Sequence, residues 1–500
     1  MASAQSGFKV RGTNLAGWLL IEGFVTPHLF DLVPNKDFLD GTTLEFESVA
    51  TKKNLCVNPG EVEGGDDWTN APDKFRLWRL GENTFEFRLR NGKFVGLDGN
   101  LRTNVVAVPT NGTIKFEIIK KSDGKDCKTV RIRASTGKYL RVHSDDSVTA
   151  DVAEVTGWED NDPTVFNYTM VPVYKMAAHT DITGDFQLQN GLGSKAAEVM
   201  QKHYESFVVE KDFELMREYG VNAVRIPVGW WTAYDPNPPF PYVSGSLKAL
   251  DNALYWAQKY GIKVILDLHA APGSQSGVAH SGTRDGSVEW GKTDETINQT
   301  LEVIEIFAKR YQNHESLYGI ELLNEPRYPD VSLESVEKYY RAAHGVIRKY
   351  NPTVHVIFNE MLSFDFGNED EHALFRALLP LAKSLDNTVI DVHWYNFFID
   401  SKEAKDHINY VTEKRNQDMS HHTTHLTSDN GKVLLFIGEW SCGGTTGAEL
   451  TESEAQEFVR AQIQVYDQAS FGWTFLAWNH QQHFWSLKWL LQKNLVNLRS

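Results

Sequence analysis

The feature that most constrains this chain is a regular alternation of apolar, strand-like runs with helix-like stretches. Short apolar runs bounded by breakers are typical of strands buried on both faces, as in a parallel sheet. Eight such strand–helix units predict closure into a (β/α)8 TIM barrel of the α/β class. The expected strands lie within Arg11–Leu20, Ala223–Trp230, Lys263–Gln275, Leu317–Pro326, His355–Glu360, Thr388–Phe398, Leu434–Trp440 and Trp473–Asn479.

One stretch interrupts this alternation. From residue 42 to 173 the sequence consists of short β-type runs separated by Gly, Asn and Asp, without a helical period. Three similar segments begin at Thr43, Thr84 and Thr129, so they recur after 41 and then 45 residues. Hairpins repeated with this period predict a three-fold β unit. We therefore expect a catalytic barrel in residues 1–41 and 174–500, and a β-trefoil in residues 42–173 inserted after the first strand. Units of this kind usually bind carbohydrate or protein. The alternative is a passive insert without a binding role.

The charge of the chain excludes two classes of partner. The 500 residues carry a formal charge of −16, whereas a surface that binds nucleic acid or anionic lipid needs clustered Lys and Arg. No apolar run approaches the roughly 18 residues of a transmembrane helix. We therefore expect neither a nucleic-acid nor a membrane partner, and neutral sugars remain compatible with the charge.

Neither a cofactor nor a metal is predicted. The three cysteines form no CxxC pair, and His269 and His393 lack a third ligand candidate at a recognisable spacing. The first residues also lack the apolar core of a signal peptide. The compartment stays open: cytoplasmic, or extracellular and cell wall if a leader has been removed.

Two predicted strands lead into a glutamate: LYGIELLNEP reaches Glu325, and LLFIGEW reaches Glu439. An α/β barrel keeps its chemistry at the carboxyl ends of its strands. Hydrolysis of a glycosidic bond requires two carboxyl groups, one to protonate the leaving oxygen and one to attack the anomeric carbon. We assign Glu325 as the acid and then base, and Glu439 as the nucleophile. The plainer alternative is two unrelated acids that each cap a following helix.

Other side chains at the strand ends suit supporting roles. Arg225 is the natural cation to hold the charge of Glu439, and Tyr395 can donate its hydroxyl to the same carboxylate. Asn324 is expected to bind the sugar hydroxyl next to the reacting carbon. His269 alone is more often a hydrogen-bonded core residue than a ligand. The aromatic side chains expected to offer a ring face to the sugar are Trp478, with Trp440 or Trp230 as helpers.

These motifs resemble those of a known family. RGTNLAGWLLIEGF, VRIPVGWW, DLHAAPGSQSG, LLNEP, DVHWY, IGEWS and GWTFLAWN closely resemble glycoside hydrolase family 5, in its exo-β-1,3-glucanase-like branch, over nearly the full length. Plant members of that branch carry a fascin-like domain after the first strand. The resemblance implies a retaining mechanism on a β-glucoside or β-glucan. It also implies a glucose subsite that contains Glu22, far from the bond broken, together with Arg225, His269, Asn324, His393, Tyr395 and Trp478.

The chain departs from the family pattern at a few positions. Ala16 and Phe24 differ from the residues usual in that branch, and the stretches 442–447 and 479–483 are unusual. We expect these departures to lie on the aglycone side, so they bear on the leaving group rather than on the reaction. Residues assigned to that side are Trp230, Trp440, Phe397 and His483.

Three interpretations follow. The first is an exo-acting β-glucosidase or glucan 1,3-β-glucosidase. The second is an endo-acting β-glycanase, such as a cellulase or mannanase, on the same barrel. The third is a non-catalytic protein that binds carbohydrate or the cytoskeleton through its trefoil. A retaining site requires carboxyl groups about 5–5.5 Å apart, and an inverting site about 6.5–9.5 Å.

Overall fold

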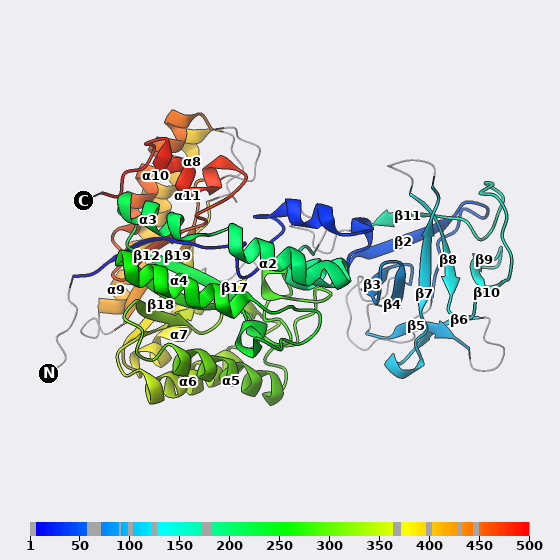
Figure 1. Ribbon diagram of the computed structural model, residues 1–500, viewed down its shortest axis with the longest axis horizontal. Coiled ribbons are helices and arrows are strands. Elements are labelled where there is room, and N and C mark those ends of the chain that lie inside the picture. The colour runs from blue at the N-terminus through cyan, green and yellow to red at the C-terminus, as the bar shows by residue number, and fades with distance from the viewer. Residues whose placement is uncertain are drawn as a thin grey trace. The chain divides into compact units, whose positions relative to one another are not determined.

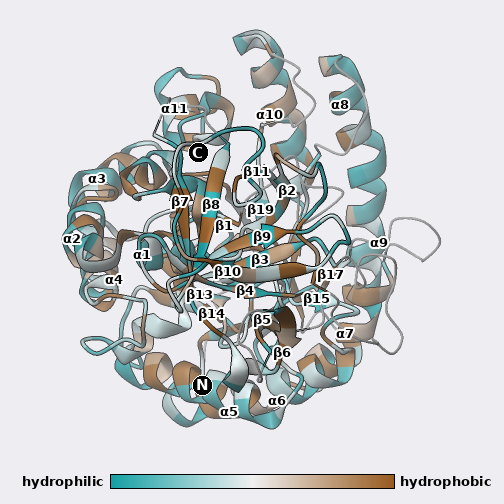
Figure 2. Cartoon of the chain, turned by 90° about the vertical axis from the view of Figure 1, so that its right-hand side faces the viewer, coloured by the Kyte–Doolittle hydropathy of each residue, from teal (hydrophilic) through white to brown (hydrophobic). Residues whose placement is uncertain are grey.

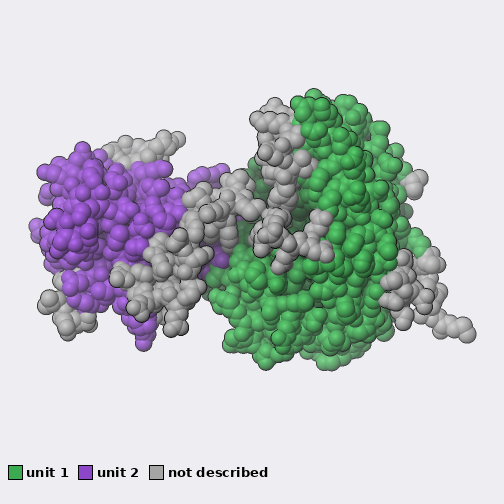
Figure 3. Space-filling model, turned by 180° about the vertical axis from the view of Figure 1, so that it is seen from behind, with its two compact units in different colours: residues 1–27, 197–283, 287–500 green, residues 28–196, 284–286 purple. Residues whose placement is uncertain are grey.

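A computed structural model of the chain divides into two compact units, shown in different colours in Figure 3. Unit 1 contains residues 1–27, 197–283 and 287–500, and unit 2 contains residues 28–196 and 284–286. The structure describes residues 7–57, 72–89, 92–98, 104–122, 128–171, 182–363, 372–396, 403–427, 433–443 and 450–499.

Unit 1 is a closed barrel of eight parallel strands. Each strand pairs with the next in chain order, and the last pairs with the first, so the ring has no free edge. This confirms the predicted (β/α)8 architecture. The strands are β1 (Val10–Asn14), β12 (Ala223–Gly229), β13 (Lys263–Ala270), β14 (Leu317–Glu321), β16 (His355–Asn359), β18 (Thr388–His393), β19 (Leu434–Trp440) and β20 (Gly472–Phe475).

Helices surround this barrel, and α5 and α6 lie side by side in Figure 1. Individual helices carry both hydrophilic and hydrophobic residues in Figure 2, because each buries one face against the strands. The helices of unit 1 are α2 (Ala196–Ser206), α3 (Glu210–Glu218), α4 (Ser246–Tyr260), α5 (Asp294–Arg310), α6 (Leu333–Tyr350), α7 (Ala373–Lys383), α8 (Ala404–Tyr410), α9 (Asn416–Thr427), α10 (Glu452–Tyr466) and α11 (Leu487–Gln492). Within the described ranges, no helix has both the length and the apolar character needed to span a bilayer.

Seven of the eight strands are shorter than predicted, and two of these differences bear on the site. The first ends at Asn14 rather than Leu20, and Gly17 beyond it has a φ of 72°, which turns the chain away from the sheet. Strand β14 ends at Glu321, four residues before Glu325. Glu325 has a φ of 43°, a left-handed conformation that cannot continue a strand. The acid at position 325 therefore sits on the loop after the strand, not on its last residue.

The amino ends of the strands close the barrel with an apolar floor. Every barrel strand, or the residue just before it, contributes one buried side chain to this cluster. Its members are Val10, Ala223, Ile265, Tyr318, Ile357, Val389, Phe436 and Phe471. The polar and charged side chains of the barrel interior lie further along the same strands.

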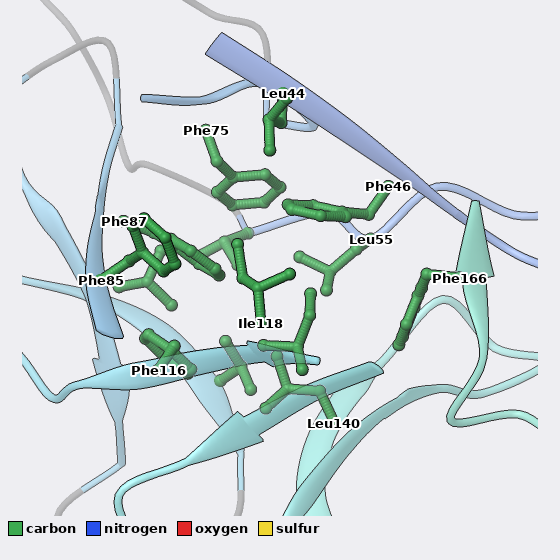
Figure 4. Packing of buried hydrophobic residues seen from close by; sticks show 14 of the residues in the cluster. Leu44, Phe46, Leu55, Phe75, Phe85, Phe87, Phe116, Ile118, Leu140 and Phe166 are labelled. Atoms are coloured by element: carbon green, nitrogen blue, oxygen red, sulfur yellow. The ribbon is translucent and has the colours of Figure 1, made fainter. Parts of the chain in front are cut away.

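Unit 2 is built from short antiparallel strands. Six of them pair in a ring, in the order β2, β3, β4, β7, β8, β11 and back to β2. The hairpins β5–β6 and β9–β10 extend from this ring. The core between these strands is rich in phenylalanine, with Phe87 stacked on Phe116 at 4.7 Å between ring centroids (Figure 4). The strands are β2 (Thr43–Ser48), β3 (Phe75–Arg79), β4 (Thr84–Arg88), β5 (Phe94–Leu97), β6 (Val105–Val108), β7 (Phe116–Lys120), β8 (Thr129–Ala134), β9 (Tyr139–Val142), β10 (Val148–Val152) and β11 (Phe166–Met170), and helix α1 (Asp185–Leu192) follows them.

Candidate active site

Two glutamates share one site at the carboxyl ends of the barrel strands. Glu439 is the sixth residue of β19, and Glu325 lies on the loop after β14. One carboxylate oxygen of Glu325, one of Glu439 and a ring nitrogen of His393 all lie within 4.8 Å of one another. The two acids are far apart in the sequence but lie close together in the fold.

The loop that carries Glu325 is held by hydrogen bonds from three directions. The backbone N–H of Glu325 donates to Asn359 Oδ1 (3.0 Å), and Gln275 Nε2 donates to the carbonyl of Asn324 (2.8 Å). The Tyr339 hydroxyl donates to the carbonyl of Leu322 (2.8 Å). These contacts fix a left-handed residue that would otherwise be strained.

Arg225 is the electrostatic centre of the site. Its side chain is fully buried, and its Nε and Nη2 donate to the two oxygens of Glu321 at 2.7 and 2.9 Å. Nη1 donates to Glu439 at 2.8 Å, and Nη2 lies 3.2 Å from Asp267. A planar guanidinium suits this role because its fixed donors reach several carboxylates at once.

Asn324 is oriented by the same guanidinium. Its Oδ1 accepts a hydrogen bond from Arg225 Nη2 at 2.8 Å, and a guanidinium can only donate, so the amide oxygen must face it. The Nδ2 atom is buried and has no hydrogen-bond partner among the described residues. An amide N–H₂ group without a partner is available to a ligand hydroxyl.

His393 and Glu325 hold one proton between them. His393 Nδ1 lies 2.6 Å from Glu325 Oε1, and Nε2 lies 3.0 Å from Asn359 Nδ2 and 3.3 Å from Asp391 Oδ2. Burial opposes protonation of His393, but the negative charges of Glu439 and Asp391 outweigh it and raise its pKa well above the ordinary value. Burial favours neutral Glu325, but the hydrogen bond and charge of His393 lower the pKa of this carboxyl.

Glu439 is held in its ionised form. Burial disfavours the charge, but the positive charges of His393 and Arg225 outweigh this and lower the pKa of Glu439 far below the ordinary value. The Tyr395 hydroxyl donates to Glu439 Oε2 at 2.7 Å, which adds a hydrogen bond to the charged form. An ionised, oriented carboxylate is what a nucleophile at this position requires.

Glu22, His269 and His280 form a second group in the same site. One carboxylate oxygen of Glu22 and one ring nitrogen of each histidine lie within 4.8 Å of one another. Burial, together with the charges of Glu439 and Glu325, raises the pKa of Glu22 to about 8. Burial lowers the pKa of His269 to about 3 and that of His280 to about 4. Near neutral pH the carboxyl is therefore protonated, and both imidazoles are uncharged.

Two tryptophan predictions are wrong. Trp478 is fully buried, and its indole N–H donates to Asp212 on α3 at 2.9 Å, so neither ring face is open to a sugar. Trp440 is also fully buried, and its ring packs on Trp473 and Phe475. Successive residues of a strand point to opposite faces, so Trp440 must point away from the site if Glu439 points into it.

The remaining aglycone predictions are not decided by the structure. Trp230 is half-buried just after β12, and its ring contacts those of Trp231, Tyr234 and Tyr242. His483 is exposed and stacks on Trp489 with 4.6 Å between ring centroids. Phe397 lies outside the described residues, as does most of the 442–447 stretch.

Sequence reasoning missed several residues of the site. One of them is Trp485, which lies 6.0 Å from the ring of Tyr395 and 4.7 Å from the ring of Phe24, a residue already expected on the aglycone side. His280 lies 3.3 Å from Glu325 Oε2 but stands in a long loop with no periodic pattern to mark it. A period of two could have found the buried acids, because Glu321 and Asp391 interrupt otherwise apolar strands.

Residues 189–482, more than half of the chain, match the family model described as cellulase (glycosyl hydrolase family 5). The chain belongs to glycosyl hydrolase family 5. It is therefore a glycoside hydrolase with a glycan substrate, and family membership argues against a non-catalytic binding protein. Residues 35–171 match the model of a domain of unknown function, DUF7910.

Individual proteins agree with the family-5 assignment. A probable glucan 1,3-beta-glucosidase A of Aspergillus fumigatus is 31% identical over 317 residues, which cover 57% of this chain and 72% of the relative. A glucan 1,3-beta-glucosidase of Schwanniomyces occidentalis is 29% identical over 341 residues, covering 62% and 76%. The crystal structure of rutinosidase from Aspergillus niger matches 62% of this chain and 88% of its own with a TM-score of 0.51 and 20% identity, which shows a shared fold.

Proposed function

We propose that the chain is a retaining, exo-acting β-glucosidase or glucan 1,3-β-glucosidase, which removes terminal β-linked glucose from oligosaccharides or glycosides. The observation that carries this proposal is the approach of one oxygen of Glu325 to within 4.8 Å of one oxygen of Glu439. Retaining sites hold their carboxyl groups about 5–5.5 Å apart, because the nucleophile itself contacts the anomeric carbon; inverting sites leave room for a water.

In the first step, Glu439 attacks the anomeric carbon while the bond from that carbon to the leaving oxygen breaks. The leaving oxygen takes the proton held by the Glu325–His393 pair, so no alkoxide is released. Arg225 and Tyr395 orient the attacking carboxylate. The unpartnered Nδ2 of Asn324 is the donor for the adjacent sugar hydroxyl, a contact that strengthens as positive charge develops on the ring.

In the second step, a water attacks the anomeric carbon and gives a proton to Glu325, while the bond from that carbon to the Glu439 oxygen breaks and restores the free carboxylate. The charge of Glu439 is one cause that raises the pKa values of both Glu325 and His393. Formation of the ester removes that charge, so both groups then bind a proton less tightly. The same glutamate can thus act as an acid in one half of the reaction and as a base in the other.

Exo action is supported by Glu22. Its carboxyl is protonated near neutral pH and lies beside His269 and His280, which gives one wall of the site a cluster of hydrogen-bonding groups for sugar hydroxyls. A wall of this kind suits a terminal sugar, whereas an endo-acting enzyme needs a cleft open at both ends. The names of the two fungal relatives agree with a terminal β-linked glucose as the substrate class.

The experiment has two parts. Digestion of a chromogenic β-glucoside, followed by NMR from the first turnover, is expected to give β-glucose before mutarotation; α-glucose as first product would overturn retention. Digestion of β-1,3-linked gluco-oligosaccharides labelled at the reducing end is expected to release free glucose and a labelled chain one unit shorter. Internal cuts, which release labelled pieces of several lengths at once, would establish an endo-acting β-glycanase instead.

We also propose that residues 42–173 form a fascin-like β-trefoil. Support comes from the closed ring of six paired strands and from the three similar segments that begin at Thr43, Thr84 and Thr129. The barrel of the catalytic domain would then take residues 1–41 and 174–500. An experimental structure in which the three segments do not superpose under a three-fold rotation would rule out the trefoil.

A further inference from the structure

Three segments of the barrel unit bring a carboxylate and two imidazoles together. Glu22 follows β1, His269 is the seventh residue of β13, and His280 lies in the short helix Ala279–Ser281. One carboxylate oxygen of Glu22 and one ring nitrogen of each histidine all lie within 4.8 Å of one another. Two imidazoles and one carboxylate are a donor set that binds Zn²⁺ and leaves a further coordination position open.

His269 is prepared as a ligand by its neighbour. Its Nδ1 lies 2.6 Å from Asp267 Oδ2, so Nδ1 carries the proton and Nε2 keeps its lone pair. Asp267 is itself held 3.2 Å from Arg225. A histidine that donates its other ring N–H to a carboxylate is the arrangement that orients imidazole ligands in metal sites.

The other carboxylate–imidazole groups of the site are less suitable. Both ring nitrogens of His393 already face polar partners, with Nδ1 at 2.6 Å from Glu325 and Nε2 at 3.0 Å from Asn359. Both oxygens of Glu321 accept from Arg225. By contrast, the polar contacts of His280 Nε2 are long, 3.3 Å to Glu325 and 3.4 Å to Ser276. A metal can replace these contacts at little cost.

We infer that Glu22, His269 and His280 bind one Zn²⁺ ion in the sugar-free protein, and that the ion and the sugar exclude each other. Zn–N and Zn–O bonds of about 2.0–2.2 Å hold two ligand atoms at most about 4.4 Å apart, so separations within 4.8 Å are close to those of a metal site. The ion is an inhibitor rather than a part of the reaction. The mutual exclusion rests on the proposed function, because it assumes that Glu22 and His269 bind sugar hydroxyls.

The test uses the full-length chain without a metal-binding tag, stripped with a chelator. Titration with Co²⁺ is followed by visible absorption, and Zn²⁺ binding by calorimetry. We expect one ion per chain and the intense visible bands of four- or five-coordinate Co²⁺. The variants His280→Asn and Glu22→Gln should each weaken binding at least about tenfold, since even loss of an outer-shell partner costs about 10–100-fold. Circular dichroism checks that each variant folds, and two variants on different segments guard against failure of one.

The matched control removes two histidines elsewhere in the same unit. His421 and His425 lie four residues apart on α9, with 4.3 Å between their ring centroids, and helix pairs of this spacing also chelate metals. The double variant His421→Asn with His425→Asn should leave the affinity of the Glu22 site unchanged. Loss of binding in this double variant but not in the pocket variants would overturn the inference, as would a six-coordinate Co²⁺ spectrum or no binding at all.

A competition arm separates this inference from the proposed function. Excess glucose is expected to displace Zn²⁺ from the wild-type chain and to bleach the Co²⁺ bands. If the pocket variants lose the ion but glucose does not displace it, the metal site stands and the proposed sugar position falls. If the chain hydrolyses β-glucosides but binds no Zn²⁺, the function stands and the metal site falls.

Discussion

The two ends of the barrel use the same eight strands for opposite purposes. At the amino end the strands contribute Val10, Tyr318, Phe436 and their neighbours to a floor of buried apolar side chains. A few residues further along, the strands carry Arg225 and the buried acids that face it. Apolar burial stabilises the fold, whereas a buried ion network contributes little net stability because desolvation offsets its attraction. Stability and chemistry are thus divided along each strand.

Strand β19 allows a direct comparison, because Phe436 and Glu439 stand three residues apart on it. The largest expected effect is that of Glu439→Gln. Loss of the nucleophile should lower kcat by on the order of 10⁴-fold. The melting temperature should fall by less than in Phe436→Ala, because Arg225 keeps Asp267 and Glu321 as charge partners. The check is steady-state kinetics beside a thermal melt. The exposed residue Glu334 on α6 gives the control Glu334→Gln, which should change neither.

Glu325→Gln should lower activity by about 10²–10⁴-fold on substrates with poor leaving groups, which need a proton from the acid. On glycosides with good leaving groups the loss should be much smaller, since these depart without protonation. A series of aryl β-glucosides of graded leaving-group acidity measures the difference. Equal loss across the series would show that Glu325 is not the acid.

At the opposite end, Phe436→Ala should lower the free energy of unfolding by about 3–5 kcal/mol, because it leaves a cavity in the floor. At temperatures where the variant is folded, kcat should equal that of the wild type. Chemical denaturation and kinetics on the same sample measure both. A large fall in kcat without loss of stability would contradict the division between the two ends.

The smallest expected effect is a change in pH dependence. Burial and the neighbouring charges raise the pKa of Glu22 to about 8, so the carboxyl is neutral below that pH and ionised above it. Ionisation adds a negative charge beside Glu439 and Glu325, so activity should fall as the pH rises through about 8. Gln cannot ionise, so Glu22→Gln should move this alkaline limb to higher pH, even though its activity is lower at every pH. If the alkaline limb stays at the same pH in this variant, a group other than Glu22 causes the fall in activity.

The architecture could be predicted from the sequence because its signals are local. Eight apolar runs between helices fix a parallel barrel, and glutamates near the ends of two runs fix the candidate acids. The orientation of aromatic side chains could not be predicted in the same way. Trp478 follows β20 on an irregular segment, where no period states which way the ring points. Trp440 was predictable, since a period of two places it opposite Glu439.

The resemblance placed Glu22 and His269 in one subsite, but His280 beside them lay beyond sequence reasoning. His269 lacks a third metal ligand at any regular spacing, because Glu22 and His280 reach it through the folding of two loops. The same holds for Trp485, which packs on Phe24 from the opposite end of the chain. Contacts made by loops depend on tertiary structure, and a pattern along one strand does not contain them.

The left-handed backbone at Glu325, with its φ of 43°, has a consequence for how this chain can evolve. Glycine adopts this conformation without strain and asparagine with little, so either substitution would relieve the backbone strain of the folded loop. Both would also delete the acid. A screen that selects only for heat resistance should therefore enrich inactive chains at this position, since the residue that reacts is one that the fold alone would not choose.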